Sequence, residues 1–168
     1  RRVLFQSGSI LGGAALDGTG AISLSAGQST NGSAVAVNVG NVGAINRPSN
    51  LTIAAGNSGV SPAFTVRPGS VTTGNIEAAG VTINATQGAI TVGNIGAVAR
   101  ASGVTLTANE ASSVSGAIAA GNITAASLNT TSRLNSTKIG NVDVTGSANL
   151  TSENTVTLGD VTAQSLTV

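Results

Sequence analysis

The sequence predicts an all-β fold, a parallel β-helix (β-solenoid) with about 19 residues and three short strands per coil. Three observations lead to this prediction: a tripeptide that recurs at regular intervals, a period-two alternation of aliphatic and polar residues, and a composition that disfavours helices. Each of them is a property of the chain as a whole, so the prediction concerns architecture before it concerns any site.

The recurring tripeptide is Gly, then Asn or Asp, then Ile or Val. Three of the five intervals between its copies are identical, since the successive spacings are 34, 19, 28, 19 and 19. The copies begin at Gly40, Gly74, Gly93, Gly121, Gly140 and Gly159. A repeat of about 20 residues is typical of solenoid coils, in which each unit stacks on its neighbours.

Short alternating segments recur within each period. Triplets such as Val81-Thr82-Ile83 and Ile90-Thr91-Val92 place a polar residue between two aliphatic ones. Since successive side chains of a strand point to opposite faces, this pattern predicts strands with their aliphatic residues inward. Three such segments per period describe one turn of a parallel β-helix.

The composition supports strands over helices and over disorder. The chain has 168 residues with 23 Gly, 8% charged residues and 1% aromatic residues, and a mean hydropathy of +0.31. Disordered chains normally combine low hydropathy with high net charge. Gly, Asn, Thr, Val and Ser also lower helix stability. A folded β structure is therefore expected.

Residues 1–9 have two interpretations. The stretch Val3–Ser7 is similar to the recognition site of a picornaviral 3C-type protease that expression vectors carry, and it is equally suited to a first strand. Residues 10–168 are predicted to form the β-helix shaft, with irregular coils or loops near 43–73 and 96–120.

The first irregular region contains all three prolines and the stretch 61–69, with Phe64 and Arg67. It is interpreted either as a protruding contact loop made by these two residues or as an irregular or 34-residue double coil. The second region exceeds one period by nine residues, which are expected within 98–103 or 109–116.

The second residue of the tripeptide predicts a ladder. Gly followed by Asn tolerates left-handed backbone, which suits a sharp corner between coils. Stacked amides are expected to bond to one another from coil to coil. A cation site is the alternative, but calcium prefers several carboxylates. A structural ladder without metal or cofactor is therefore predicted, formed by Asn41, Asn75, Asn94, Asn122, Asn141 and Asp160.

Three phrases of the sequence resemble the repeats of filamentous-haemagglutinin-type exoproteins, the large adhesins of bacterial two-partner secretion. They are GAISLSAG (20–27), GNIEAAGVTINATQGAITVGNI (74–95) and GNITAASL (121–128), and the resemblance spans about residues 10–168. It implies a right-handed β-helix, secretion through an outer-membrane transporter, a place on the bacterial cell surface and a host-cell or neighbouring-cell receptor. It carries over no catalytic residue.

The charges argue against other classes of function. The net charge is +1 and the basic residues are scattered, which gives no footprint for nucleic acid. The most apolar stretch, residues 10–16, is too short to insert across a membrane.

Glycan cleavage needs paired carboxylates, but Glu77 and Asp143 share only their place in the period and are not neighbours, and the chain has no His. No enzyme is predicted from the six acids, Asp17, Glu77, Glu110, Asp143, Glu153 and Asp160.

Two further classes remain open besides the adhesive shaft. One is a phage or virus fibre segment. The other is an ice-binding solenoid, for which two outward columns are relevant: the ninth place of the period gives Thr82, Asn129, Ala148 and Thr167, and the eighteenth gives Thr91, Lys138 and Thr157. Lys138 is expected to interrupt the second column. The sequence stops partway round a coil, at Val168, from which end-to-end self-stacking of a piece of a longer array is expected.

Overall fold

The structure, a computed structural model, describes residues 3–7, 10–27, 34–56, 68–109 and 116–168. Strands make up the regular structure of these ranges, and no helix occurs in them. In chain order the strands are β1 (Val3–Ser7), β2 (Ile10–Leu11), β3 (Ala21–Ala26), β4 (Val35–Val39), β5 (Asn50–Ala55), β6 (Gly69–Thr73), β7 (Gly80–Thr86), β8 (Ile90–Val92), β9 (Gly103–Asn109), β10 (Ile118–Ala120), β11 (Ile123–Ala125), β12 (Leu128–Ser132), β13 (Thr137–Ile139), β14 (Val142–Val144), β15 (Ser147–Ser152), β16 (Val156–Leu158), β17 (Val161–Thr162) and β18 (Ser165–Thr167).

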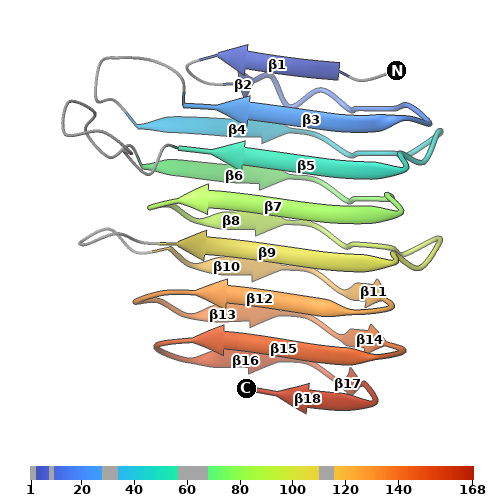
Figure 1. The fold of residues 1–168 in the computed structure, drawn as a ribbon, viewed down its shortest axis with the longest axis vertical. Helices are drawn as coiled ribbons and strands as arrows, with labels where there is room; N and C mark the ends of the chain where they lie inside the picture. Colours follow the sequence, from blue (N-terminus) through green and yellow to red (C-terminus); the bar gives the residue numbers. More distant parts are fainter. Residues whose placement is uncertain (1–2, 8–9, 28–33, 57–67, 110–115) are drawn as a thin grey trace.

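All the strands pair in parallel, in three sheets. The eight-stranded sheet has the order β1-β3-β5-β7-β9-β12-β15-β18, the seven-stranded sheet β16-β13-β10-β8-β6-β4-β2, and the three-stranded sheet β11-β14-β17. Figure 1 shows the strands stacked in layers from β1 at one end to β18 at the other. The expectation of an all-β fold built from parallel sheets is thereby confirmed.

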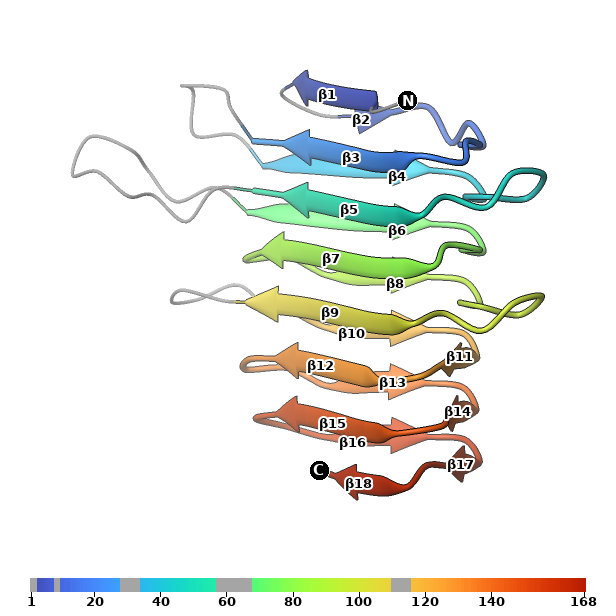
Figure 2. The ribbon, with the colours of Figure 1, turned by 45° about the vertical axis from the view of Figure 1, so that its right-hand side comes forward.

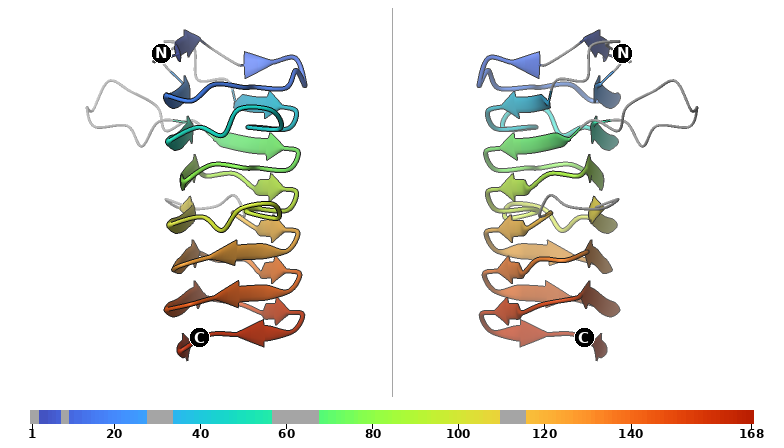
Figure 3. Two further views of the ribbon diagram at one scale, coloured as in Figure 1. Left: turned by 90° about the vertical axis from the view of Figure 1, so that its right-hand side faces the viewer. Right: turned by 90° about the vertical axis from the view of Figure 1, so that its left-hand side faces the viewer.

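The chain visits the sheets in a fixed rotation. From β11 it enters β12 in the eight-stranded sheet, β13 in the seven-stranded sheet and β14 in the three-stranded sheet, beside β11. One such return to the neighbouring strand is called a circuit below. Earlier in the chain the third side is reduced to single bridges, which join Leu16, Val42, Ile76, Ile95 and Ile123 in succession. Figure 3 views the stack from the two edges of Figure 1.

The length of a circuit varies while the pairing is maintained. Thr137 pairs with Val156 and so closes a 19-residue circuit, whereas Val37 of β4 pairs with Val71 of β6 across a 34-residue interval. Since these two strands are direct neighbours, the longer interval is one irregular circuit, and the alternative of a double coil is wrong. The stretch from Ile95 to Val104 is four residues longer than the matching stretch from Ile76 to Val81, so part of the second excess lies at 96–102.

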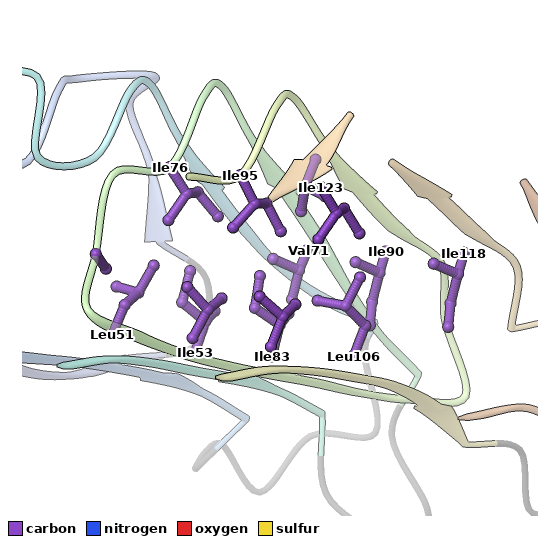
Figure 4. Close-up of a cluster of buried hydrophobic side chains, with 14 of the residues drawn as sticks. Leu51, Ile53, Val71, Ile76, Ile83, Ile90, Ile95, Leu106, Ile118 and Ile123 are labelled. Carbon is purple, nitrogen blue, oxygen red and sulfur yellow. The ribbon is translucent and has the colours of Figure 1, made fainter. Parts of the chain in front are cut away.

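The core consists of aliphatic side chains in three rows (Figure 4). One row comes from the eight-stranded sheet, one from the seven-stranded sheet and one from the bridge positions, and the labelled members are fully or almost fully buried: Leu51, Ile53, Ile83 and Leu106; Val71, Ile90 and Ile118; Ile76, Ile95 and Ile123. Burying one such side chain contributes about 1.5–3 kcal/mol. The alternation seen in the sequence therefore produces the core.

The predicted register fails at one place. A constant 19-residue period places Ala148 outward, but Leu128 pairs with Ala148 and Ala148 is fully buried. The cause is one additional residue in the corner between β14 and β15, where the N–H of Gly146 donates to the carbonyl of Ala126. Asn149 takes the outward position instead, opposite Asn129.

The N-terminal stretch lies in a strand. Val3–Ser7 form β1, whose residues pair with Ile22–Ala26 of β3. Among the described residues we find no helix of the length and hydropathy that crossing a membrane requires.

Candidate functional site

The six residues predicted to form a ladder lie in one column at a corner of the stack. The backbone N–H of each member donates to the side-chain Oδ1 of the member before it, over 2.8 Å from Asn75 to Asn41, 2.9 Å from Asn94 to Asn75, 2.8 Å from Asn122 to Asn94, 2.8 Å from Asn141 to Asn122 and 3.0 Å from Asp160 to Asn141. We call these residues the asparagine column. The bonds run from backbone to side chain, which corrects the expected pairing of amide with amide.

The glycines of the repeat have a different role from the one expected. None of them lies in the left-handed region, where the described glycines are Gly13, Gly27, Gly43, Gly56 and Gly96. A Cβ atom on Gly74, Gly93, Gly121, Gly140 or Gly159 would instead meet the Oδ1 atom of the preceding Asn at less than 3.0 Å. Glycine leaves room for the side chain of the column, which a larger residue would have to displace.

The other predicted site lies outside the described residues. Phe64 and Arg67, the proposed contact residues, belong to the stretch 57–67 that the structure does not describe.

Two loops project from the same corner, inside the regions 43–73 and 96–120 for which irregular coils or loops were expected; their likeness to each other was not predicted. Residues 43–49 and 96–102, called the corner loops, extend from the stack on either side of the circuit that contains Glu77 (Figure 2). Each follows an Asn of the column in a matching sequence, Asn-Val-Gly-Ala-Ile-Asn-Arg at 41–47 and Asn-Ile-Gly-Ala-Val-Ala-Arg at 94–100. Their glycines share a positive φ, 72° at Gly43 and 69° at Gly96. This internal repeat, whose second copy comes two circuits after the first, is the signal in the sequence that would have located them.

An acidic side chain from the preceding circuit holds the backbone of each corner loop. Asp17 Oδ1 accepts the N–H groups of Ile45 at 2.9 Å and Asn46 at 3.3 Å. In the second loop, Glu77 Oε1 accepts the N–H of Val98 at 3.0 Å, and Glu77 Oε2 accepts that of Ala99 at 3.3 Å. The two loops therefore share a conformation and a means of fixing it.

The arginine of each corner loop binds backbone carbonyl groups of later circuits. Arg47 Nη2 donates to the carbonyls of Ala78 at 3.1 Å, Ala99 at 3.0 Å and Arg100 at 2.7 Å. This guanidinium thus connects the first corner loop to the second.

Arg100 makes the corresponding contacts from the second loop. Its Nη1 donates to the carbonyls of Ala125 at 2.8 Å and Asp143 at 2.7 Å, and its Nη2 forms an ion pair with Asp143 Oδ2 at 2.6 Å. Both guanidiniums therefore anchor loops to the stack.

A shallow groove lies between the corner loops. Its lining includes Ala44, Arg47, Glu77 and Ala97. We call Glu77, on the circuit between the loops, its floor, and the exposed side chains of Ile45 and Val98 its rim. These rim residues are 84% and 89% exposed, and they occupy equivalent positions of the repeated sequence. Among the exposed large hydrophobic residues of the described ranges, these two have the highest exposure.

Four acidic side chains of the described residues are engaged in holding the chain. Asp17, Glu77 and Asp143 make the contacts given above, and Glu153 accepts from Arg133 Nε at 3.2 Å and from the N–H of Leu134 at 3.3 Å. In the described ranges no three His, Cys, Asp or Glu side chains come together as metal ligands.

Comparisons with protein-family models, with curated proteins and with solved structures found no match for the chain.

Proposed function

We propose that the chain is a right-handed, single-stranded parallel β-helix whose basic coil follows the 19-residue repeat and contains three short strands. The rotation of the chain through three parallel sheets supports this, as do the 19-residue separations that recur in the column. The hand follows from the strong preference of parallel strand connections for right-handed crossovers, and it agrees with the resemblance described above.

The proposed role is that of a non-catalytic structural and adhesive shaft segment of a large secreted bacterial surface exoprotein. The observation that carries it is the continuous pairing from β1 to β18, which connects every circuit to the next along one axis. The asparagine column adds a second connection from Asn41 to Asp160. With eight strands in its largest sheet and a strand spacing of about 4.8 Å, the stack extends over roughly 35–40 Å. The outer-membrane transporter and the cell-surface receptor are partners inferred from the resemblance alone.

Duplication of one circuit tests the architecture. A second copy of residues 121–139 inserted after Ile139 adds one coil, so small-angle scattering should show a rod longer by about 4.8 Å with an unchanged cross-section. The matched control inserts only residues 121–130, which places the inward residues out of register and should lower the thermal midpoint sharply. Equal effects of the two insertions would contradict the coil assignment.

Bead adhesion tests the role. Beads coated with the chain should attach to epithelial or bacterial cells more often than albumin-coated beads do. A purified chain that instead released reducing ends from acidic polysaccharides would contradict a non-catalytic shaft.

A second candidate function, ice binding, is favoured by the outer face of the eight-stranded sheet. Two columns of short side chains without charge run along it: Ser23, Thr52, Thr82, Thr105, Asn129, Asn149 and Thr167; and Ser25, Ala54, Asn84, Thr107, Thr131 and Thr151. Because Asn149 stands where Ala148 was expected, this face is more regular than the sequence suggested. The seven-stranded sheet has Lys138 in its outer column, between Ala119 and Thr157.

Thermal hysteresis measurements decide this candidate. Thr105→Lys should abolish hysteresis because it puts a hydrated charge in the middle of the uncharged face, whereas Thr91→Lys lies in the column that Lys138 already interrupts and should have no effect. A wild-type protein without hysteresis would exclude ice binding.

A further inference from the structure

We propose that the groove between the two corner loops is a docking site for an extended peptide segment that carries an aliphatic side chain next to a lysine or arginine. The proposal concerns the groove defined above, with Ile45 and Val98 at its rim and Glu77 in its floor. It is independent of the shaft role, because it rests on the side chains of this corner and not on the length of the stack.

The width of the groove suits one extended chain. Val42, Ile76 and Ile95, which begin the two loops and the circuit between them, are successive bridge partners. The loops therefore start two strand spacings apart, or about 9.6 Å. The shorter circuit with Ile76 and Glu77 occupies the level between these starting points. A single extended partner chain would therefore lie on top of this circuit, between the projecting parts of the two loops.

The walls of the groove are held in place before any partner arrives. Asp17 and Glu77 bind the backbones of the two loops, and Arg47 connects the first loop to the carbonyls of Ala99 and Arg100 in the second. A preorganised site loses little conformational entropy on binding, which raises affinity for a given contact area.

The rim supplies apolar contact on both sides. Ile45 and Val98 are β-branched, so each side chain has few rotamers to lose on binding. Their high exposure leaves apolar area that a partner side chain would remove from water, at about 25 cal/mol per Å². An aliphatic residue lying between the two side chains would contact both.

The charge of the groove favours a lysine or arginine in the bound peptide, next to its aliphatic residue. Arg47 also lines the groove, but its Nη2 donates to three backbone carbonyls. Glu77 is the acidic residue of the lining. Each of its oxygens accepts one backbone N–H and retains capacity for a further donor. A cationic side chain matches this carboxylate. A second copy of the chain fits less well, because a symmetric contact would bring two Glu77 carboxylates together.

Selection from a random heptapeptide library tests the proposal. The immobilised chain serves as the target, with prior depletion on a variant that carries Ile45→Ser and Val98→Ser. Recovered peptides should contain an aliphatic residue within two positions of Lys or Arg. Their affinity for the double variant, measured by fluorescence polarisation, should fall at least tenfold. Glu77→Gln should weaken binding several-fold and reduce its dependence on salt, while keeping an oxygen for the N–H of Val98.

Leu134→Ser is the matched control, because Leu134 is also an exposed aliphatic residue, at 58%, and lies outside the groove. It should leave peptide affinity unchanged. Thermal midpoints of all variants must stay close to that of the wild type, which separates loss of the groove from loss of the fold. The proposal is overturned if no peptide survives the depletion, if recovered peptides lack a cationic residue, or if sedimentation shows a dimer that Ile45→Ser dissolves.

Discussion

The Cα atom of Gly121 lies beneath the side-chain oxygen of Asn94, so closely that a Cβ atom there would overlap it. The same oxygen accepts the N–H of Asn122, the next residue of the chain, at 2.8 Å. The Gly-Asn pairs of neighbouring circuits thus work together. The Asn side chain of one circuit accepts the N–H of the Asn in the next circuit, and the Gly of that next circuit leaves room for this side chain.

Replacement of Gly121 by Ala should lower the free energy of unfolding by about 2 kcal/mol, because the added methyl group overpacks the corner. The cost should be smaller by about 1 kcal/mol in an Asn94→Ala background, where the obstructing oxygen is gone. Urea denaturation of the four proteins of this double-mutant cycle gives the coupling directly. Strict additivity would show that the contact has no energetic consequence.

Asn122→Ala should cost about 1 kcal/mol, at the low end for a lost hydrogen bond because the column is exposed and water replaces part of the bond. Asn122→Asp is the control, since a carboxylate oxygen accepts the N–H of Asn141 equally well. The two variants are compared by their urea midpoints. A loss from the aspartate variant as large as that from alanine would argue against the acceptor role.

Thr130→Val should stabilise the protein by about 1 kcal/mol, because the buried hydroxyl of Thr130 has no hydrogen-bond partner and valine of the same shape removes that desolvation cost. Ser132→Ala should have the opposite sign, because the buried Ser132 hydroxyl donates to the carbonyl of Gly116 at 2.8 Å. Differential scanning calorimetry measures both shifts, and equal signs would contradict the explanation.

Arg100→Met should destabilise the protein more than Asp143→Asn does. The methionine variant removes the guanidinium donor from the carbonyls of Ala125 and Asp143, the first of which keeps the N–H of Thr145 at 3.2 Å. The asparagine variant only removes a charge from a pair whose side chains are 34% and 51% exposed. A partly exposed ion pair contributes only about 0–1 kcal/mol. Chemical denaturation at low and high salt compares the two, and the larger loss should persist in salt.

Properties that repeat could be predicted from the sequence. Alternating triplets such as Val81-Thr82-Ile83 indicated which side chains enter the core, and the recurring Gly-Asn pair indicated which residues share a corner. These patterns can be recognised in the sequence because every circuit needs the same residue types at the same places, so the pattern recurs along the chain.

Single departures from the repeat were not predictable. One additional residue before β15 places Ala148 in the core. The residue types of that corner give no indication of this insertion. Irregular coils or loops were expected in both regions of the corner loops, but the likeness of the two loops was not, because their shared sequence returns only after two circuits and is not part of the 19-residue period. The prediction for the glycines was also wrong. A glycine chosen for its backbone freedom and one chosen for its small size look the same in a sequence. The position of Asn94 Oδ1 over Gly121 shows that small size is the reason here.

The outer columns of the eight-stranded sheet hold residues at regular distances along the stack. Cysteines placed at Thr52, Thr82 or Thr105, which are successive partners in one column, would carry spin labels at multiples of about 4.8 Å. The spacing is set by backbone pairing and not by the length of the intervening segments, so the longer segment from Thr52 to Thr82 and the shorter one from Thr82 to Thr105 span the same step. Distances along the stack therefore follow the number of circuits and are independent of the number of residues.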